Sequence, residues 1–362
     1  MHYSLKRVKS IPEKKDIGSL LPEELEPFLK ELGQPRFRTK QVFKWLQTGI
    51  SSFDEMTDLP KNLRTVLEER CLLTGVTVER KLCSQLDGTV KYLYRLHDGA
   101  HIESVLMKYE HGYTVCISTQ VGCRMGCSFC ASGLNGLVRN LTPYEMLSQV
   151  IFAGRDNGVR ISNVVMMGMG EPLDNFNHSV RFLQLVSHPQ GLNIGLRHIS
   201  LSTSGIVPGI YKLAEYAFPI TLSVSLHAPN DGIRKSIMPV AKRWSVAELI
   251  QACRDYQKVT TRRISFEYAL IEGVNDSEQC AEELARLLKG LLCHVNLIPA
   301  NPVRENSFQK PDRKKIELFR TRLEKSGMNA TIRRTLGADI EASCGQLRRR
   351  VEKELQREGN KP

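Results

Sequence analysis

The sequence has no uninterrupted apolar run that approaches the roughly 18 residues needed to cross a membrane. Its first sixteen residues are basic but lack the apolar stretch of a secretion signal. Long-period repeats and low-complexity linkers are also missing. These absences predict a globular cytoplasmic protein that has no membrane partner. Its 362 residues suffice for one large α/β domain and a smaller second domain.

Acidic residues are in deficit, and the cysteines do not form the pattern of a disulfide scaffold. Lysine and arginine outnumber aspartate and glutamate by 51 to 39, which gives a net charge of +12. This balance favours a polyanionic partner such as nucleic acid, although an ordinary basic enzyme can have the same composition. Several of the ten cysteines are clustered, which indicates a metal or redox role in a reducing cytosol.

The N-terminal part reads as a leader and a small helical unit. Residues 1–16 form a basic leader, and residues 17–75 are expected to contain helices at 27–32, at 39–46 and after Pro60. The positions expected to face inward are Val42, Phe43, Leu46, Leu63 and Val66. Two interpretations of this unit stay open, an RNA-docking module and a solvated basic surface. Its basic residues include Arg36, Arg38, Lys40, Lys44 and Lys61.

From Val76 the pattern changes to strands. Three segments up to residue 110 alternate apolar and polar residues and are separated by Asp87-Gly88 and Asp98-Gly99, which predicts a β-hairpin extension over 76–110. Six further strand-like runs then alternate with helical patterns. These runs are TVCIST, SNVVMMG, HISLSTSG, TLSVSLHA, ISFEYALI and HVNLIPA.

Repeated strand–helix units define the predicted fold class, which is α/β. Capping boxes at Thr142 and Ser245 mark two of the helix starts. Six such units predict a parallel sheet curved into a partial (βα)6 barrel over 111–347, followed by a charged tail at 348–362. Chemistry in this fold gathers at the carboxyl ends of the strands. The polar or glycine-rich positions at those ends are Gly170, Glu171, Ser202, Ser225, Leu226, His227 and Asn301.

The segment CRMGCSFC carries the strongest chemical signal. It places Cys123, Cys127 and Cys130 on one tight loop after a strand. Iron–sulfur clusters are normally held by four thiolates, so three leave one iron free. Such an iron can chelate the amino and carboxylate groups of S-adenosylmethionine, and one electron from the cluster can then break the sulfonium C–S bond to release a 5′-deoxyadenosyl radical. The loop therefore predicts a radical-generating iron–sulfur site.

Zinc is the rival metal for these cysteines. Cys116 would complete a Cys₄ structural site with the three loop cysteines. Zinc ribbons, however, usually space their cysteines as two separated pairs, and Cys116 lies inside a strand-like run. The spacing and the barrel pattern downstream favour iron–sulfur over zinc.

Seven motifs in order carry a close resemblance to a known family. They are GYTVCISTQVGCRMGCSFC, NVVMMGMGEP, LSTSG, SLHAPND, GVND, NLIPANP and SCGQL, and together they span about residues 20–347. The chain resembles the RlmN/Cfr family of radical S-adenosylmethionine RNA methyltransferases. One departure is Ser343, where the family pattern leads one to expect alanine. Serine is also small, so this difference casts little doubt on the resemblance.

The resemblance implies one 4Fe-4S cluster on the three loop cysteines and two S-adenosylmethionine molecules per turnover. The first methylates the Cys344 thiolate, and the radical made from the second removes hydrogen from that S-methyl group. The resulting carbon radical adds to an RNA adenine. Cys116 then frees the product through a transient disulfide with Cys344, and Glu103 matches the family's proton acceptor. Taken alone, Glu103 reads as a surface strand carboxylate.

The resemblance also implies substrates and partners. These are 23S ribosomal RNA near the peptidyl-transferase centre and transfer RNA at the adenosine 3′ of the anticodon, both converted to 2-methyladenosine. An external electron donor, flavodoxin-like in character, is also expected. Two alternatives stay open: Cfr-like methylation at C8 of the same ribosomal adenine, which confers antibiotic resistance, and a zinc-containing RNA-binding protein without activity.

Overall fold

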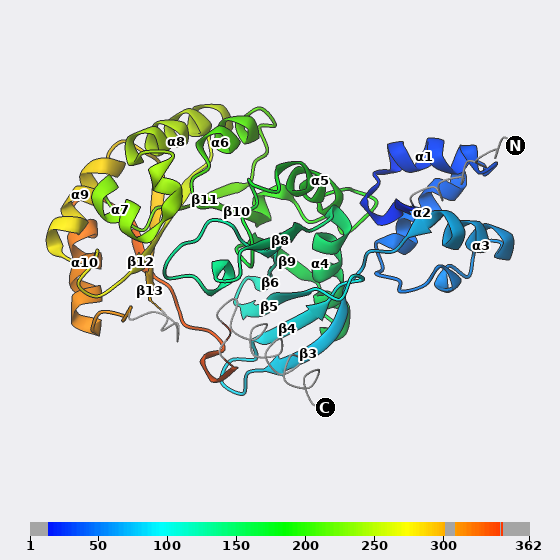
Figure 1. Cartoon of the computed structure of the whole chain (residues 1–362), viewed down its shortest axis with the longest axis horizontal. Coiled ribbons are helices and arrows are strands. Elements are labelled where there is room, and N and C mark those ends of the chain that lie inside the picture. Colours follow the sequence, from blue (N-terminus) through cyan, green and yellow to red (C-terminus); the bar gives the residue numbers. More distant parts are fainter. Residues whose placement is uncertain (1–13, 301–307, 341, 343–362) are drawn as a thin grey trace, which may run out of the picture.

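The computed structural model describes residues 14–300, 308–340 and 342. One ten-stranded sheet organises the molecule, in the order β14-β13-β12-β11-β10-β9-β6-β5-β4-β3 (Figure 1). In the described part of the chain β3 and β14 are its two unpaired edges, so the sheet is curved but not closed. The predicted α/β fold with a partial barrel is confirmed.

Parallel strands form the barrel half of the sheet, from β6 to β14. Their bounds are β6 Gly112–Cys116, β9 Ile161–Met166, β10 Ile199–Thr203, β11 Thr221–Ser225, β12 Ile264–Leu270, β13 Cys293–Pro299 and β14 Ala330–Ile332. The first six match the six predicted runs, whereas the short β14 was not predicted. The helices after them are α4 Pro143–Asn157, α5 Phe176–Val186, α6 Val207–Ala214, α7 Asp231–Ile237, α8 Val246–Thr260, α9 Glu278–Leu288 and α10 Arg313–Lys325.

Antiparallel strands extend the sheet beyond β6. Their bounds are β3 Thr77–Cys83, β4 Val90–Arg95 and β5 His101–Tyr109. They agree with the three alternating segments of the sequence. A separate small ribbon pairs β7 Gln120–Gly122 with β8 Leu137–Asn140 and brackets the cysteine loop.

The N-terminal unit contains α1 Pro22–Glu31, α2 Phe37–Leu46 and α3 Lys61–Arg70, with a short parallel pair of β1 Lys15–Asp16 and β2 Cys71–Leu72. Two predictions were wrong here. The first helix starts at Pro22 rather than Pro27, because Pro22 takes the first helical position and packing carries the helix through the interior proline. In α3 the buried residue is Leu67, not Val66, because it lies one turn after Leu63 on the same face.

The N-terminal unit packs closely on the barrel, with α4 and α5 as its contact surface. A Cβ on Gly18 would lie 2.3 Å from the ring of Tyr144, so only glycine fits there. The Tyr144 hydroxyl donates to the Leu46 carbonyl at 2.9 Å. Arg181 makes two hydrogen bonds to the Glu24 carboxylate. The two parts therefore share one hydrophobic core.

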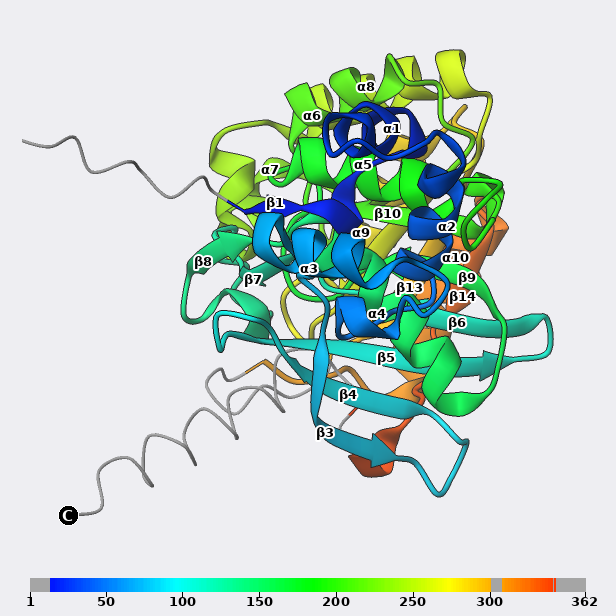
Figure 2. The ribbon, with the colours of Figure 1, turned by 90° about the vertical axis from the view of Figure 1, so that its right-hand side faces the viewer.

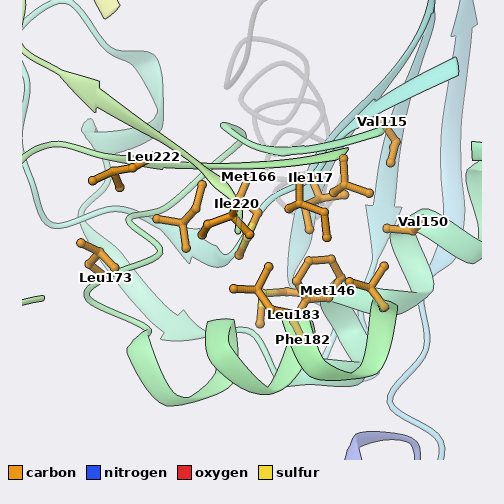
Figure 3. Packing of buried hydrophobic residues seen from close by; sticks show 14 of the residues in the cluster. Val115, Ile117, Met146, Val150, Met166, Leu173, Phe182, Leu183, Ile220 and Leu222 are labelled. Atoms are coloured by element: carbon orange, nitrogen blue, oxygen red, sulfur yellow. The ribbon is translucent and has the colours of Figure 1, made fainter. Parts of the chain in front are cut away.

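The core between the sheet and its outer helices is apolar (Figure 3). Met146 and Val150 of α4 and Phe182 and Leu183 of α5 lie against strand residues such as Met166. Burial of such side chains stabilises the fold by about 1.5–3 kcal/mol each. In the described part of the chain, no helix combines the length and apolarity required to cross a membrane.

Candidate active site

The cysteine loop leaves the sheet after β7, at the carboxyl-terminal side of the barrel strands. Gly122 has φ +81°, and a Cβ there would lie 2.1 Å from the Gly136 carbonyl oxygen. The Cys123 amide donates to the same carbonyl at 2.9 Å. Both ends of the loop are thus fixed by backbone contacts, which is why glycine is required next to the first cysteine.

The three thiols lie within electrostatic reach of one another. Burial raises the pKa of the Cys123 thiol to about 12, and the nearby Glu171 and Cys130 raise it further. Burial also raises the pKa of Cys127, and the neighbouring Cys130 and Cys123 add to the rise. Three buried thiolates repel one another unless cationic iron binds them, so this donor set fits an iron–sulfur cluster.

An apolar wall surrounds the loop. Cys127 and Phe129 pack against Ile237 and Met238 at the end of α7. The Phe129 ring contacts the His227 ring edge-on, with centroids 4.8 Å apart. This wall keeps water from the thiols and couples the loop to the end of β11.

The GMGEP segment after β9 packs directly on the chain that leads into the loop. A Cβ on Gly168 would lie 2.6 Å from the Ile117 carbonyl oxygen, and one on Gly170, where φ is +107°, would lie 2.7 Å from the Gln120 amide nitrogen. The Glu171 amide donates to Gln120 Oε1 at 2.9 Å. The glycines therefore permit a close approach that brings Glu171 near Cys123.

Glu171 is fully buried, and burial raises its pKa. Its carboxylate accepts hydrogen bonds from the amides of Ser204 at 2.6 Å and Leu173 at 3.0 Å. The buried Ser204 hydroxyl beside it has no hydrogen-bond partner in the described structure. Hydrogen-bonding capacity thus remains next to the cysteine loop, which suits an ammonium-bearing ligand.

The predicted polar residues of β10 and β11 also lie near this end of the barrel. Ser202 and Ser225 are half-buried, and Leu226 and His227 are buried. His227 Nδ1 accepts from the Ala269 amide at 2.8 Å, and burial lowers its pKa to about 3. The imidazole is therefore neutral, with its proton on Nε2. Asn301 lies outside the described residues.

A buried arginine that the sequence interpretation missed joins these strand ends. Arg234 of α7 donates from Nε to the Leu226 carbonyl at 3.0 Å and from Nη2 to the Ser204 carbonyl at 2.5 Å. Its Nη1 has no partner in the described structure. Nothing in the sequence distinguishes it from the surface arginines, since α7 is short and polar.

Cys116 lies on the inner face of the sheet, away from the cysteine loop. It is directly opposite Val105 of β5 and packs with Val105 and Met107. Glu103 lies two residues before Val105 and so projects from the same face. Glu103 is 2% exposed, which rules out the surface-carboxylate interpretation, and it forms an ion pair with the buried Lys91 Nζ at 3.1 Å.

A cavity lies beside Cys116. Besides Cys116 it is lined by residues of β5, of the carboxyl end of β13 and of the segment 333–342, which ends at Ala342. We call this segment the strap. Cys344 lies outside the described residues, but two residues of chain span at most about 7 Å, so its α-carbon lies within that distance of Ala342.

Two aspartates fasten the strap to the β3–β4 turn. The Asp339 carboxylate accepts from the Ser84 hydroxyl at 2.7 Å and from the Gln85 amide at 2.9 Å. Asp87 accepts from the Gly337 amide at 2.8 Å. Burial opposes ionisation of Asp87, but the hydrogen bonds from Gly337 and Thr89 lower its pKa to about 2. Both contacts join residues about 250 positions apart, which is why the sequence did not reveal them.

The zinc alternative finds no support in this arrangement. Cys116 packs in a different cluster from Cys127. Within residues 14–300, 308–340 and 342, no three histidine, cysteine, aspartate or glutamate side chains are placed to bind a single metal ion. A four-iron cube separates its thiolate ligands more widely than one zinc ion does, so the loop suits the cluster better.

Comparisons with known proteins agree with this site. Residues 117–288 match the Radical SAM superfamily, and residues 16–73 match the ribosomal RNA large subunit methyltransferase N-terminal domain. A probable dual-specificity RNA methyltransferase RlmN from Alkaliphilus oremlandii (strain OhILAs) is 55% identical over 93% of this chain and 98% of its own length. One of the same description from Clostridioides difficile (strain 630) is 52% identical over 93% and 99%.

Among solved structures, a radical SAM methyltransferase from Sphaerobacter thermophilus superposes with a TM-score of 0.88. It is 49% identical and covers 92% of this chain and 98% of its own. The partial barrel and its three-cysteine loop thus define a radical S-adenosylmethionine enzyme, a class that uses an iron–sulfur cluster and S-adenosylmethionine. More narrowly, the chain belongs to the RlmN family of methyltransferases. The family and the radical methyltransferase activity predicted from the sequence are confirmed.

Proposed function

We propose that this enzyme makes 2-methyladenosine in 23S ribosomal RNA near the peptidyl-transferase centre and in transfer RNA at the adenosine 3′ of the anticodon. The description of its relatives as dual-specificity RNA methyltransferases supports two kinds of RNA substrate. Their RlmN name favours C2 of adenine over the Cfr-like C8 product. The net charge of +12 agrees with a polyanionic substrate.

In this proposal Cys123, Cys127 and Cys130 bind one 4Fe-4S cluster. Gly170 and Glu171, the β10 and β11 ends with Ser202, Ser225, Leu226 and His227, and Asn301 bind S-adenosylmethionine, two molecules per turnover. When bound, the cluster supplies the electron that cleaves the sulfonium C–S bond. An external donor, flavodoxin-like in character, provides that electron. The Phe129–His227 contact and the buried Glu171 support a dry, oriented pocket next to the thiols.

One observation carries the proposed role of the second thiol. Cys116 and Ala342 line the same cavity, and Cys344 follows Ala342 by two residues. A sulfur on the strap can therefore reach the Cys116 sulfur, which a two-thiol mechanism requires. The Asp339 and Asp87 contacts hold the strap near this position.

The covalent chemistry follows from these placements. Cys344 carries the methyl group that becomes a methylene bridge between its sulfur and adenine C2. Glu103, ionised beside Lys91, accepts the C2 proton. The Cys116 thiolate then attacks the Cys344 sulfur and forms a disulfide, while the bond from that sulfur to the methylene carbon breaks. The electron pair of the broken bond passes to the product carbon, which takes up a proton and becomes the methyl group.

The helical unit of residues 17–75 is proposed to dock RNA through phosphate contacts. Its basic side chains include the exposed Arg36 and Lys40, and it packs rigidly on α4 and α5. Binding through phosphates weakens steeply as salt concentration rises. The extension 76–110 and the barrel 111–347 then supply the catalytic face.

Product analysis tests the proposal. Reconstituted enzyme is incubated without oxygen with S-adenosylmethionine, a chemical reductant and a 23S or transfer RNA fragment, and the digested RNA is analysed by mass spectrometry against synthetic standards. We expect 2-methyladenosine from both RNAs. Formation of 8-methyladenosine would instead establish the Cfr-like activity, and unmodified RNA from enzyme with a full iron complement would refute both.

A further inference from the structure

The cavity beside Cys116 continues outward to the tip of the β5–β6 hairpin. Tyr109, Arg334 and Leu336 line both this cavity and an adjoining hollow that also includes His111. The two spaces therefore form one path from the reactive sulfur to the surface.

A pair of stacked rings stands along that path. The rings of Tyr109 and His111 are nearly parallel, with centroids 5.2 Å apart and an interplanar angle of 12°. Tyr109 is half-buried, and its hydroxyl contacts the Met107 sulfur at 3.6 Å. His111 is exposed. The inner ring is thus anchored in the protein, and the outer ring is accessible to another planar group.

The hairpin that carries the rings is held in place. Figure 2 shows β5 and β6 running side by side to a turn at the edge of the molecule. Gly112 ends this turn opposite Tyr109 with φ +113°, and a Cβ there would lie 2.3 Å from Ser162 Oγ. Such close contact with the start of β9 fixes the turn, so little ordering is needed when a ligand stacks on it.

Positive charge borders the rings. Arg333 and Arg334 follow β14 and are exposed. Burial raises the pKa of the Tyr109 hydroxyl, and the nearby charges of both arginines oppose that rise. Two guanidinium groups therefore lie near the aromatic pair and can bind phosphate.

An enzyme that modifies the C2 edge of an adenine inside structured RNA must first turn that base out of its stack, and other stacking must replace what the base gives up. Aromatic side chains replace it for single-stranded nucleotides, and arginines bind the adjoining phosphates. We propose that Tyr109 and His111 stack on the nucleotide adjacent to the target adenosine, while Arg333 and Arg334 bind its phosphates. This inference rests on the proposed RNA substrate and assigns it a recognition surface on the barrel, separate from the helical unit.

Equilibrium binding to a fluorescent RNA hairpin with the target adenosine in its loop tests the assignment. His111→Ala should weaken binding by about 5- to 150-fold, the range for loss of one stacked base, without changing the salt dependence. His111→Phe should restore binding. Arg333→Gln with Arg334→Gln should weaken binding and also lower the slope of log affinity against log salt by about 0.7 for each phosphate that is no longer neutralised. Tyr211→Ala, on the exposed face of α6, is the matched control.

Unchanged RNA affinity in both His111→Ala and the double arginine variant would overturn the assignment. So would a defect seen only when a protein electron donor is used and absent with dithionite, because the surface would then dock the reductant. Methylation by the unaltered enzyme is measured in parallel. Failure of the proposed function abolishes that signal, whereas failure of this inference leaves it intact and removes only the effect of the variants.

Discussion

The two thiol sites of this enzyme are built in different ways. The cysteine loop is fixed by backbone contacts close in sequence, such as Gly122 against Gly136 and Gly168 against Ile117. The Cys116 face is completed by the strap, which side-chain hydrogen bonds fasten to a turn about 250 residues earlier. The first site is rigid by construction, whereas the second depends on a few polar contacts that single substitutions can release.

The largest expected effect comes from the rigid site. Cys127→Ala removes a buried cluster ligand, so iron content and methylation should both fall to background. The fold should persist, because the loop's backbone contacts do not involve this side chain. Iron analysis, methylation assay and circular dichroism check this. Cys253→Ala, a buried cysteine of α8, is the control, and full iron content in Cys127→Ala would contradict the assignment.

Lys91→Met probes the buried charge on the Cys116 face. It leaves the Glu103 carboxylate buried without its cation, so the free energy of unfolding should fall by about 3–5 kcal/mol. Lys91→Met combined with Glu103→Gln should recover most of this loss, because no uncompensated charge remains. Chemical denaturation measures both. If the single variant were as stable as the double variant, the ion pair would not be what holds this face together.

Asp339→Asn weakens the strap without touching the cysteine loop. Loss of the charge-assisted bonds from Ser84 and Gln85 should displace Cys344 from Cys116 and slow methylation by up to ~100-fold. Iron content and cleavage of S-adenosylmethionine without RNA should stay unchanged. Asp255→Asn, an exposed aspartate of α8, is the control. Equal loss of both activities would mean that the strap also supports the cluster site.

The smallest expected effect is a pH dependence at His227. Its pKa is about 3 in the folded protein against an ordinary value of 6.5, so the unfolded chain binds the extra proton between these values. Stability is therefore full above pH 6.5 and falls as the pH is lowered towards 3, by at most ~1.4 kcal/mol per pH unit. His227→Gln should flatten this slope in denaturation curves recorded across that range. An unchanged slope would assign the acid sensitivity to other groups.

The contrast between the sites also explains what the sequence could predict. The loop cysteines, GMGEP and the strand-end serines lie in short segments whose spacing and alternation carry the information, so their positions near the carboxyl ends of the strands were expected. Arg234, Lys91 and Asp339 were missed, because each matters only through partners brought close by the fold. The start of α1 was wrong because tertiary packing outweighs the local effect of Pro27.

The role of Cys116 as the resolving thiol is tested most directly by purifying Cys116→Ala from cells and measuring its intact mass before and after nuclease treatment. We expect protein carrying covalently attached RNA that maps to Cys344, with Cys83→Ala, an exposed cysteine of β3, free of RNA. Cys116→Ala protein that is equally free of RNA, isolated with its full complement of iron, would contradict a transient disulfide between Cys116 and Cys344.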